Sequence, residues 1–63
     1  MSGRYTLAQL RAGMRWSQKE TATALDISTS SWNKWETGKS FPTQPNIDKI
    51  LHVFNVKYDD VIF

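Results

Sequence analysis

The most regular hydrophobic spacing lies in the last third of the chain. Apolar residues recur there at i, i+3, i+4 and i+7, namely Ile47, Ile50, Leu51 and Phe54. This spacing places the four side chains on one face of a helix. Thr43 is suited to cap that helix at its start, and Asn55 is suited to the left-handed residue at its end. The pattern therefore predicts an amphipathic helix between Thr43 and Asn55.

Two earlier helices are indicated by capping boxes, in which a hydroxyl residue is followed three positions later by Gln or Glu. The boxes are Thr6 with Gln9 and Ser17 with Glu20. Each hydroxyl accepts a hydrogen bond from a free N–H group of the first turn, and the Gln or Glu side chain bonds back. Helices are predicted over about 7–12 and 18–25, with Gly13 as the left-handed terminator of the first.

A third helix and a final turn complete the predicted elements. Ser28 is suited to cap a helix over about 29–37, and Gly38 lies past its end, where glycine is favoured. One last short helical turn is expected within residues 58–62. No segment of useful length alternates apolar and polar residues with period two. The predicted fold class is therefore all-α, a compact five-helix bundle.

The second and third predicted helices are separated by only Asp26 and Ile27. Two residues are too few for a long antiparallel hairpin and suit the sharply crossed pair called a helix-turn-helix. The apolar residues that would lock this pair are Leu25, Ile27, Trp32 and Trp35, with the small Ala22 at the close approach. Two positions depart from the pattern: Thr21 stands where leucine would pack, and Asp26 stands where glycine enters the left-handed region without strain.

Length and composition limit the class of protein. The 63 residues are enough for one domain, predicted over 1–63, and 40% of them are hydrophobic, including three Trp. The chain contains no Cys, which excludes disulfides, thiol nucleophiles and cysteine-ligated zinc. No apolar run approaches the roughly 20 residues of a membrane span. A soluble cytoplasmic protein that does not associate with membranes is expected.

Residues typical of catalytic or metal sites are sparse. The single histidine, His52, and the pair Asp59–Asp60 lack the further ligands that a metal site would need. No serine triad, phosphate-binding loop or nucleotide-binding glycine run is present. We therefore expect no enzyme activity, no cofactor, no metal and no small-molecule ligand.

The chain resembles the phage-repressor and Cro-like helix-turn-helix family, the XRE-type transcriptional regulators. The resemblance spans roughly residues 7–62, and its residues in order are Leu10-Arg11, Trp16-Ser17-Gln18, Glu20, Ala22, Ile27-Ser28, Trp35-Glu36, Gly38-Lys39, Pro42 and Phe54-Asn55-Val56. It implies a five-helix bundle whose third helix enters the major groove of double-stranded DNA while the second crosses the backbone. It also implies that Arg11 and Glu36 form a structural ion pair that holds the third helix to the bundle.

Helical phase selects candidate base contacts. If Trp32 and Trp35 face the bundle, the side chains left facing outward are Thr29, Ser30, Asn33 and Lys34. Asn favours adenine, Lys favours guanine, and the Thr methyl group suits thymine. The alternative is that these four residues are an ordinary solvated face.

Phosphate contacts are expected from the helix ends beside the groove. Six of the eight Lys and Arg residues precede residue 40, which makes this part of the chain basic. Ser17 and Gln18 begin a helix, where free N–H groups favour an anion, and the loop at residues 38–40 offers a cation and backbone donors. The predicted backbone-contacting residues are Ser17, Gln18, Ser28, Ser31, Lys39 and Ser40.

These observations predict a bacterial sequence-specific DNA-binding regulator, a repressor or Cro-like protein of a phage, prophage or other mobile element. It would occupy an operator as a homodimer on two half-sites. Residues 61–63 offer either an apolar dimer contact or the completion of the monomer core. Two other functions stay open: the DNA-binding antitoxin of a toxin–antitoxin pair, and a protein-interaction module without DNA binding.

Overall fold

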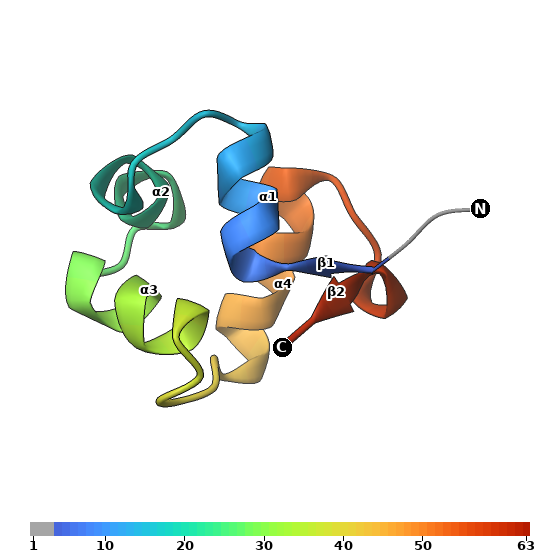
Figure 1. Ribbon diagram of the computed structural model, residues 1–63. Coiled ribbons are helices and arrows are strands. Elements are labelled where there is room, and N and C mark those ends of the chain that lie inside the picture. Colours follow the sequence, from blue (N-terminus) through green and yellow to red (C-terminus); the bar gives the residue numbers. More distant parts are fainter. Residues whose placement is uncertain (1–3) are drawn as a thin grey trace.

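A computed structural model describes residues 4–63, so residues 1–3 of the predicted domain lie outside the described residues. Its elements in order are β1 (Tyr5–Thr6), α1 (Leu7–Gly13), α2 (Gln18–Leu25), α3 (Thr29–Glu36), α4 (Gln44–Phe54), a 3-10 turn (Tyr58–Asp60) and β2 (Val61–Ile62). Figure 1 shows α2 and α3 together on one side of the molecule and the strands on the opposite side. α1 and α4 lie between them.

The end of the chain corrects the predicted all-α, five-helix bundle. Residues 4–63 contain four α-helices, and the residues expected to form a fifth make one 3-10 turn followed by β2. β2 pairs in parallel with β1, with Tyr5 opposite Val61 and Thr6 opposite Ile62. Val61 and Ile62 are β-branched and favour extended backbone, which ends the helical turn. The domain is therefore mainly helical, with one short strand pair that joins its two ends.

The helix starts follow the predicted capping boxes. Thr6 Oγ1 accepts from the Gln9 N–H at 3.1 Å, and Ser17 Oγ accepts from the Glu20 N–H at 3.0 Å. Both reciprocal bonds are also present, so both predicted boxes are confirmed. Thr43 occupies the cap position of α4 but makes no side-chain cap bond. Its Oγ1 accepts instead from the side-chain amide of Asn46, at 3.2 Å.

Three of the four residues predicted to be left-handed are left-handed, and the fourth prediction, Gly13, is wrong. Asp26 and Asn55 end α2 and α4 with φ of 56° and 54°, and Gly38 follows α3 with φ of 78°, as predicted. Gly13 is the last residue of α1 rather than its left-handed terminator. The left-handed residue after α1 is Arg15, with φ of 59°. The chain thus turns two residues later than the glycine suggested.

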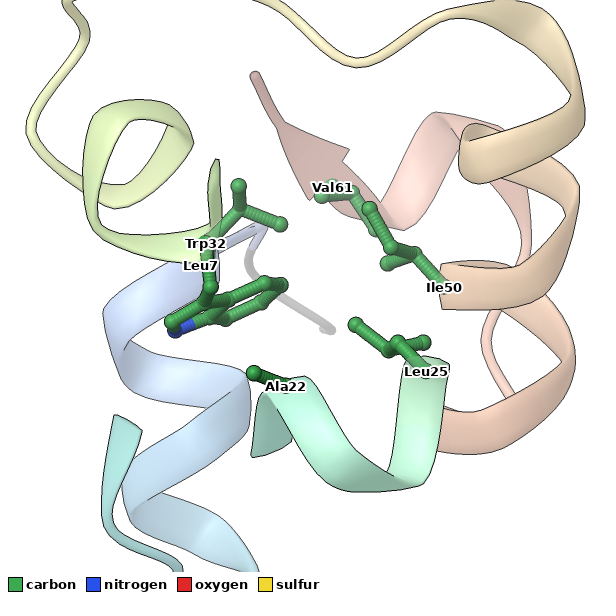
Figure 2. Close-up of a cluster of buried hydrophobic side chains, with 6 residues drawn as sticks. All are labelled: Leu7, Ala22, Leu25, Trp32, Ile50 and Val61. Carbon is green, nitrogen blue, oxygen red and sulfur yellow. The ribbon is translucent and has the colours of Figure 1, made fainter. Parts of the chain in front are cut away.

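The core forms where the four helices meet β2. Its buried apolar residues are Leu7, Ala22, Leu25, Trp32, Ile50 and Val61, which converge from every helix and from β2 (Figure 2). Trp32 and Ile50 are 0% exposed, and Val61 is 7% exposed. Val61 therefore completes the monomer core, whereas its neighbour Ile62 is 48% exposed.

Thr21 adapts to a buried position where leucine was expected. The residue is 0% exposed, and its Oγ1 donates to the Ser17 carbonyl one turn earlier, at 3.0 Å. A buried hydroxyl without a partner would be unfavourable, and this bond removes that penalty. The threonine is therefore buried without leaving its hydroxyl unsatisfied.

We expect Asp26→Gly to stabilise the domain. Asp26 is exposed and left-handed, a conformation that strains any residue with a Cβ. Allowing for the greater freedom of glycine in the unfolded chain, the net gain is about 0.5–1 kcal/mol, or roughly 2–8 °C in melting temperature for a domain of this size. Thermal unfolding followed by circular dichroism measures it, and Asn55→Gly is the matched control, with a gain of similar sign. A lower melting temperature for Asp26→Gly would contradict the left-handed turn.

Candidate nucleic-acid interface

α3 has one buried and one exposed face. Trp32 is fully buried and Trp35 is half-buried against the core. Thr29, Ser30 and Lys34 are exposed. Because Ser28 caps the helix and Trp32 anchors its middle, the three exposed side chains project from a helix held on its opposite side. Two hydroxyls and one ammonium group are thereby displayed at the edge of the α2–α3 pair.

Glu36 joins the end of α3 to α1. The Arg11 guanidinium donates from Nε to Oε2 and from Nη2 to Oε1 of Glu36, both at 2.9 Å. Arg11 Nη1 also donates to the Trp16 carbonyl at 2.9 Å, and the Trp32 indole N–H donates to Glu36 Oε2. The side chain of Glu36 is 9% exposed and that of Arg11 is 24% exposed. This bidentate pair and the indole bond fix the last turn of α3 against the bundle.

The electrostatics of this pair keep both groups charged. The hydrogen bond from Arg11 lowers the pKa of Glu36, and this effect outweighs burial, which acts in the opposite direction. The same hydrogen bond raises the pKa of Arg11. Glu36 is therefore a carboxylate that only accepts hydrogen bonds, and it controls which atoms face it.

Gln18 connects this carboxylate to α3 a second time. Its Nε2 donates to Glu36 Oε1 at 3.4 Å, and its Oε1 accepts from Asn33 Nδ2 at 3.3 Å. Both Gln18 and Asn33 are half-buried. Helical phase alone placed Asn33 on the outward side and did not predict this link. Asn33 and Glu36 nevertheless lie three residues apart and so share one side of α3. Asn33 therefore lies at the junction of α2 and α3 instead of on the fully exposed face.

The start of α2 offers fewer free donors than expected. The Ser17 N–H is used, because it donates to Glu20 Oε1 at 2.7 Å. The first N–H of α2 that bonds back along the chain is that of Glu20, which donates to Ser17 Oγ. The N–H groups of Gln18 and Lys19 come before it in the first turn. Their N–H groups and the exposed ammonium of Lys19 are thus the features of this helix end that would favour an anion.

Ser28 and Ser31, at the start of α3, use part of their hydrogen-bonding capacity on each other. Ser28 Oγ accepts from the Ser31 N–H at 3.1 Å and donates to Ser31 Oγ at 2.9 Å. The O–H of Ser28 is therefore used as a donor within this pair, whereas the O–H of Ser31 is left to donate elsewhere. Both residues lie next to the exposed start of α3.

The loop after α3 supplies a cation but not the backbone donors that were expected. The N–H groups of Lys39 and Ser40 both donate to the Lys34 carbonyl, at 2.8 and 3.3 Å, and that of Gly38 donates to Trp35. The left-handed Gly38 turns the chain so that these bonds satisfy the last carbonyls of α3. The Lys39 side chain is exposed, and Ser40 is half-buried.

Within residues 4–63, no helix is long and apolar enough to cross a membrane. The same residues bring together no group of three or more His, Cys, Asp or Glu side chains that could hold a metal ion.

Comparison with known proteins gives two matches. A family model described as helix-turn-helix matches residues 7–61. The HTH-type transcriptional activator BcrR of Enterococcus faecalis is 34% identical over 56 residues, which cover 89% of this chain and 28% of that protein. The chain thus spans less than a third of the length of this curated relative. No solved structure matches the chain significantly.

Proposed function

Since the chain belongs to the helix-turn-helix family of phage-repressor and Cro-type regulators, we propose that it recognises a specific double-stranded DNA sequence and regulates transcription by occupying an operator. The observation that carries this proposal is the two-sided α3. One side is anchored by Trp32 and Glu36, and the other exposes Thr29, Ser30 and Lys34. A rigid helix with short polar and cationic side chains outward fits the major groove.

Each outward residue of α3 has a base edge that suits it. Lys34 donates to guanine O6 and N7, and the Thr29 methyl group packs against the methyl group of thymine. Ser30 donates or accepts at either kind of base pair. Asn33, which keeps its Oδ1 and one amide N–H beside the Gln18 bond, forms the bidentate pair with adenine.

Phosphates on either side of the groove would be held by the two ends of the α2–α3 pair. At the start of α2, we propose contacts from the hydroxyl of Ser17 and the N–H of Gln18. Near α3, the proposed contacts come from Ser28, Ser31, Lys39 and Ser40. Of these, the exposed ammonium of Lys39 supplies a full charge, so it should contribute the largest share of the salt dependence.

Lys39→Ala is expected to weaken binding to all DNA sequences by the same factor. A phosphate contact carries no sequence information, and its loss removes one released counterion, so the slope of log K against log salt should shrink by about one unit. Fluorescence anisotropy at several salt concentrations measures both quantities. Lys57→Ala is the matched control, because this exposed lysine lies between α4 and the 3-10 turn, away from α2 and α3 (Figure 1). Unchanged affinity at low salt would remove Lys39 from the interface.

One α3 contacts too few bases for specific binding at physiological salt, so we propose a homodimer on two half-sites. The half-sites would lie one helical turn apart, roughly 34–36 Å. Exposed apolar side chains in the strand pair and the 3-10 turn, at Tyr5, Tyr58 and Ile62, are the candidates for this contact. The dimer requires the preferred DNA sequence to be a palindrome or near-palindrome.

Selection of binding sites from random duplex DNA, followed by salt titration of the winner, tests the proposal. A conserved pair of inverted half-sites with a steep salt slope is expected. A pool without a motif and without salt dependence would refute DNA recognition, and a single unpaired half-site would refute the homodimer.

The direction of regulation needs a separate measurement. We propose repression in the manner of phage and prophage repressors, because an operator that overlaps a promoter excludes the polymerase. The relative from E. faecalis is named an activator. A reporter gene placed behind the selected site distinguishes the two: lower expression with the protein supports repression, and higher expression overturns it.

A further inference from the structure

A continuous row of hydrogen bonds runs from α1 to the outer part of α3. It begins at Arg11, passes through Glu36 and Gln18, and ends at Asn33. The first step joins α1 to α3, and the next two steps both join α2 to α3, because Arg11 belongs to α1, Gln18 to α2, and the other two residues to α3. The row therefore connects the half-buried ion pair to one of the proposed base contacts.

The chemistry of the row gives it a direction. A guanidinium only donates hydrogen bonds, and a carboxylate only accepts them. Glu36 is held as a carboxylate, since its bonds to Arg11 lower its pKa. The amide of Gln18 must therefore turn its nitrogen toward Glu36, which leaves its oxygen facing Asn33. Asn33 in turn must offer its nitrogen to Gln18.

We propose that Gln18 is a positioning residue that fixes the side-chain amide of Asn33 before DNA binds. With one N–H held by Gln18, Asn33 presents its Oδ1 and its second N–H to the groove. This pair of atoms matches the N6 amino group and N7 of adenine. The proposal rests on the function proposed above, and it adds that the adenine preference depends on a residue of α2 that need not touch the base.

The burial of the two amides supports this role. Gln18 and Asn33 are both half-buried, whereas Lys34, which follows Asn33 on α3, is exposed. A side chain that is ordered beforehand loses less conformational freedom when it binds. Asn33 should accordingly discriminate more sharply between base pairs than a freely rotating asparagine would.

A purely structural role for the same bond makes a different prediction. If the Gln18–Asn33 bond only holds α2 against α3, its loss weakens binding to every sequence alike. If Gln18 acts through Asn33, its loss lowers the preference at one base pair only, and has no effect once Asn33 is gone. A double-mutant cycle separates these two roles.

The experiment compares the wild type with Gln18→Met, Asn33→Ala and the double variant. Methionine keeps the length of the side chain and the backbone N–H of residue 18, and it removes both amide bonds. Gln44→Met is the matched control, because Gln44 also begins a helix, is exposed, and bonds only to Asp48 on its own helix. Affinities are measured for the selected DNA site and for DNA sites in which one base pair at a time is replaced. The melting temperature of each protein is also recorded.

Asn33→Ala identifies the base pair at which Asn33 acts, because this variant no longer binds the preferred base pair more tightly than the others there. At that pair, Gln18→Met should lower the ratio of the affinities for the preferred and the other base pairs about five-fold, which corresponds to one ordinary hydrogen bond. The double variant should match Asn33→Ala, and Gln44→Met should match the wild type. In spectra of the free protein, the Asn33 side-chain amide signals should shift in Gln18→Met and not in Gln44→Met.

Three results would overturn the inference. The first is an equal loss for all sequences in Gln18→Met that adds to the effect of Asn33→Ala. The second is an unchanged preference in Gln18→Met at the pair that Asn33→Ala relaxes. The third is an Asn33→Ala variant that relaxes no position while the protein still selects a site, which refutes the inference and leaves sequence-specific binding intact. Failure of the proposed function itself is distinct, since the wild type would then select no site.

Discussion

Glu36→Ala should be one of the two most damaging single substitutions in this domain, at a cost of about 3–5 kcal/mol. The change leaves the Arg11 guanidinium without its bidentate partner and the Trp32 indole N–H without an acceptor. A domain of this length has a total stability of only about 3–9 kcal/mol. A large unfolded fraction is therefore expected without denaturant, and urea denaturation followed by circular dichroism measures it.

Glu20→Ala is the control for this substitution. Glu20 is an exposed glutamate whose side chain accepts only from the Ser17 N–H, so its replacement should cost about 1 kcal/mol or less. Equal stability of Glu36→Ala and Glu20→Ala would contradict the structural role of the ion pair.

The pH dependence of stability gives a second check on Glu36. Its pKa is lowered in the folded protein, so its contribution is present above the ordinary glutamate pKa and is lost as the pH falls toward the folded value. The wild type should therefore lose stability on acidification more steeply than Glu36→Gln. Parallel curves for the two proteins would show that the carboxylate is not stabilised by Arg11.

Trp32→Ala is expected to unfold the domain, with a loss of about 3–5 kcal/mol from transfer and cavity terms. The indole is 0% exposed, and its ring centroid lies 6.2 Å from that of Phe54 and 6.3 Å from that of Trp35. Removing it opens the centre of the core, between α3 and α4. The loss of the far-ultraviolet helical signal at 25 °C is the measurement.

Two variants place this result in context. Phe41→Ala also removes an aromatic ring, but Phe41 is 71% exposed, so a change within about 0.5 kcal/mol is expected. Trp32→Phe keeps an aromatic ring and loses the N–H bond to Glu36, and it should lie between the two alanine variants. A folded Trp32→Ala with wild-type stability would contradict the core described above.

The parts of the fold that could be predicted from the sequence are those fixed by local chemistry. Capping boxes at Thr6 and Ser17 and left-handed residues at Asp26 and Asn55 involve neighbours within a few positions, so their signals lie in short stretches of sequence. The strand pair was missed because two residues are too few for an alternating pattern. Its partner strands also lie at opposite ends of the chain, where no local signal links them.

The candidate interface divides in the same way. Helical phase was enough to place Thr29, Ser30 and Lys34 on the exposed face of α3, because Trp32 defines the opposite side. It was not enough for Asn33, whose surroundings depend on how closely α2 approaches α3. The backbone N–H groups of residues 38–40 were expected to be free for phosphate. They bond to carbonyls of α3 instead, because the left-handed Gly38 turns the chain back toward that helix.

The parallel pairing of β1 with β2 has a consequence for folding during synthesis. β1 leaves the ribosome before α1 to α4, whereas its partner β2 follows all four of these helices. The largest contact between helices joins α2 and α3, which are neighbours in sequence and can pack early, whereas the strand pair must wait for residues 61–62. A nascent chain should therefore hold α2 and α3 together while β1 and β2 are still apart. The strands would then act as the closing step of a helical domain that has already formed.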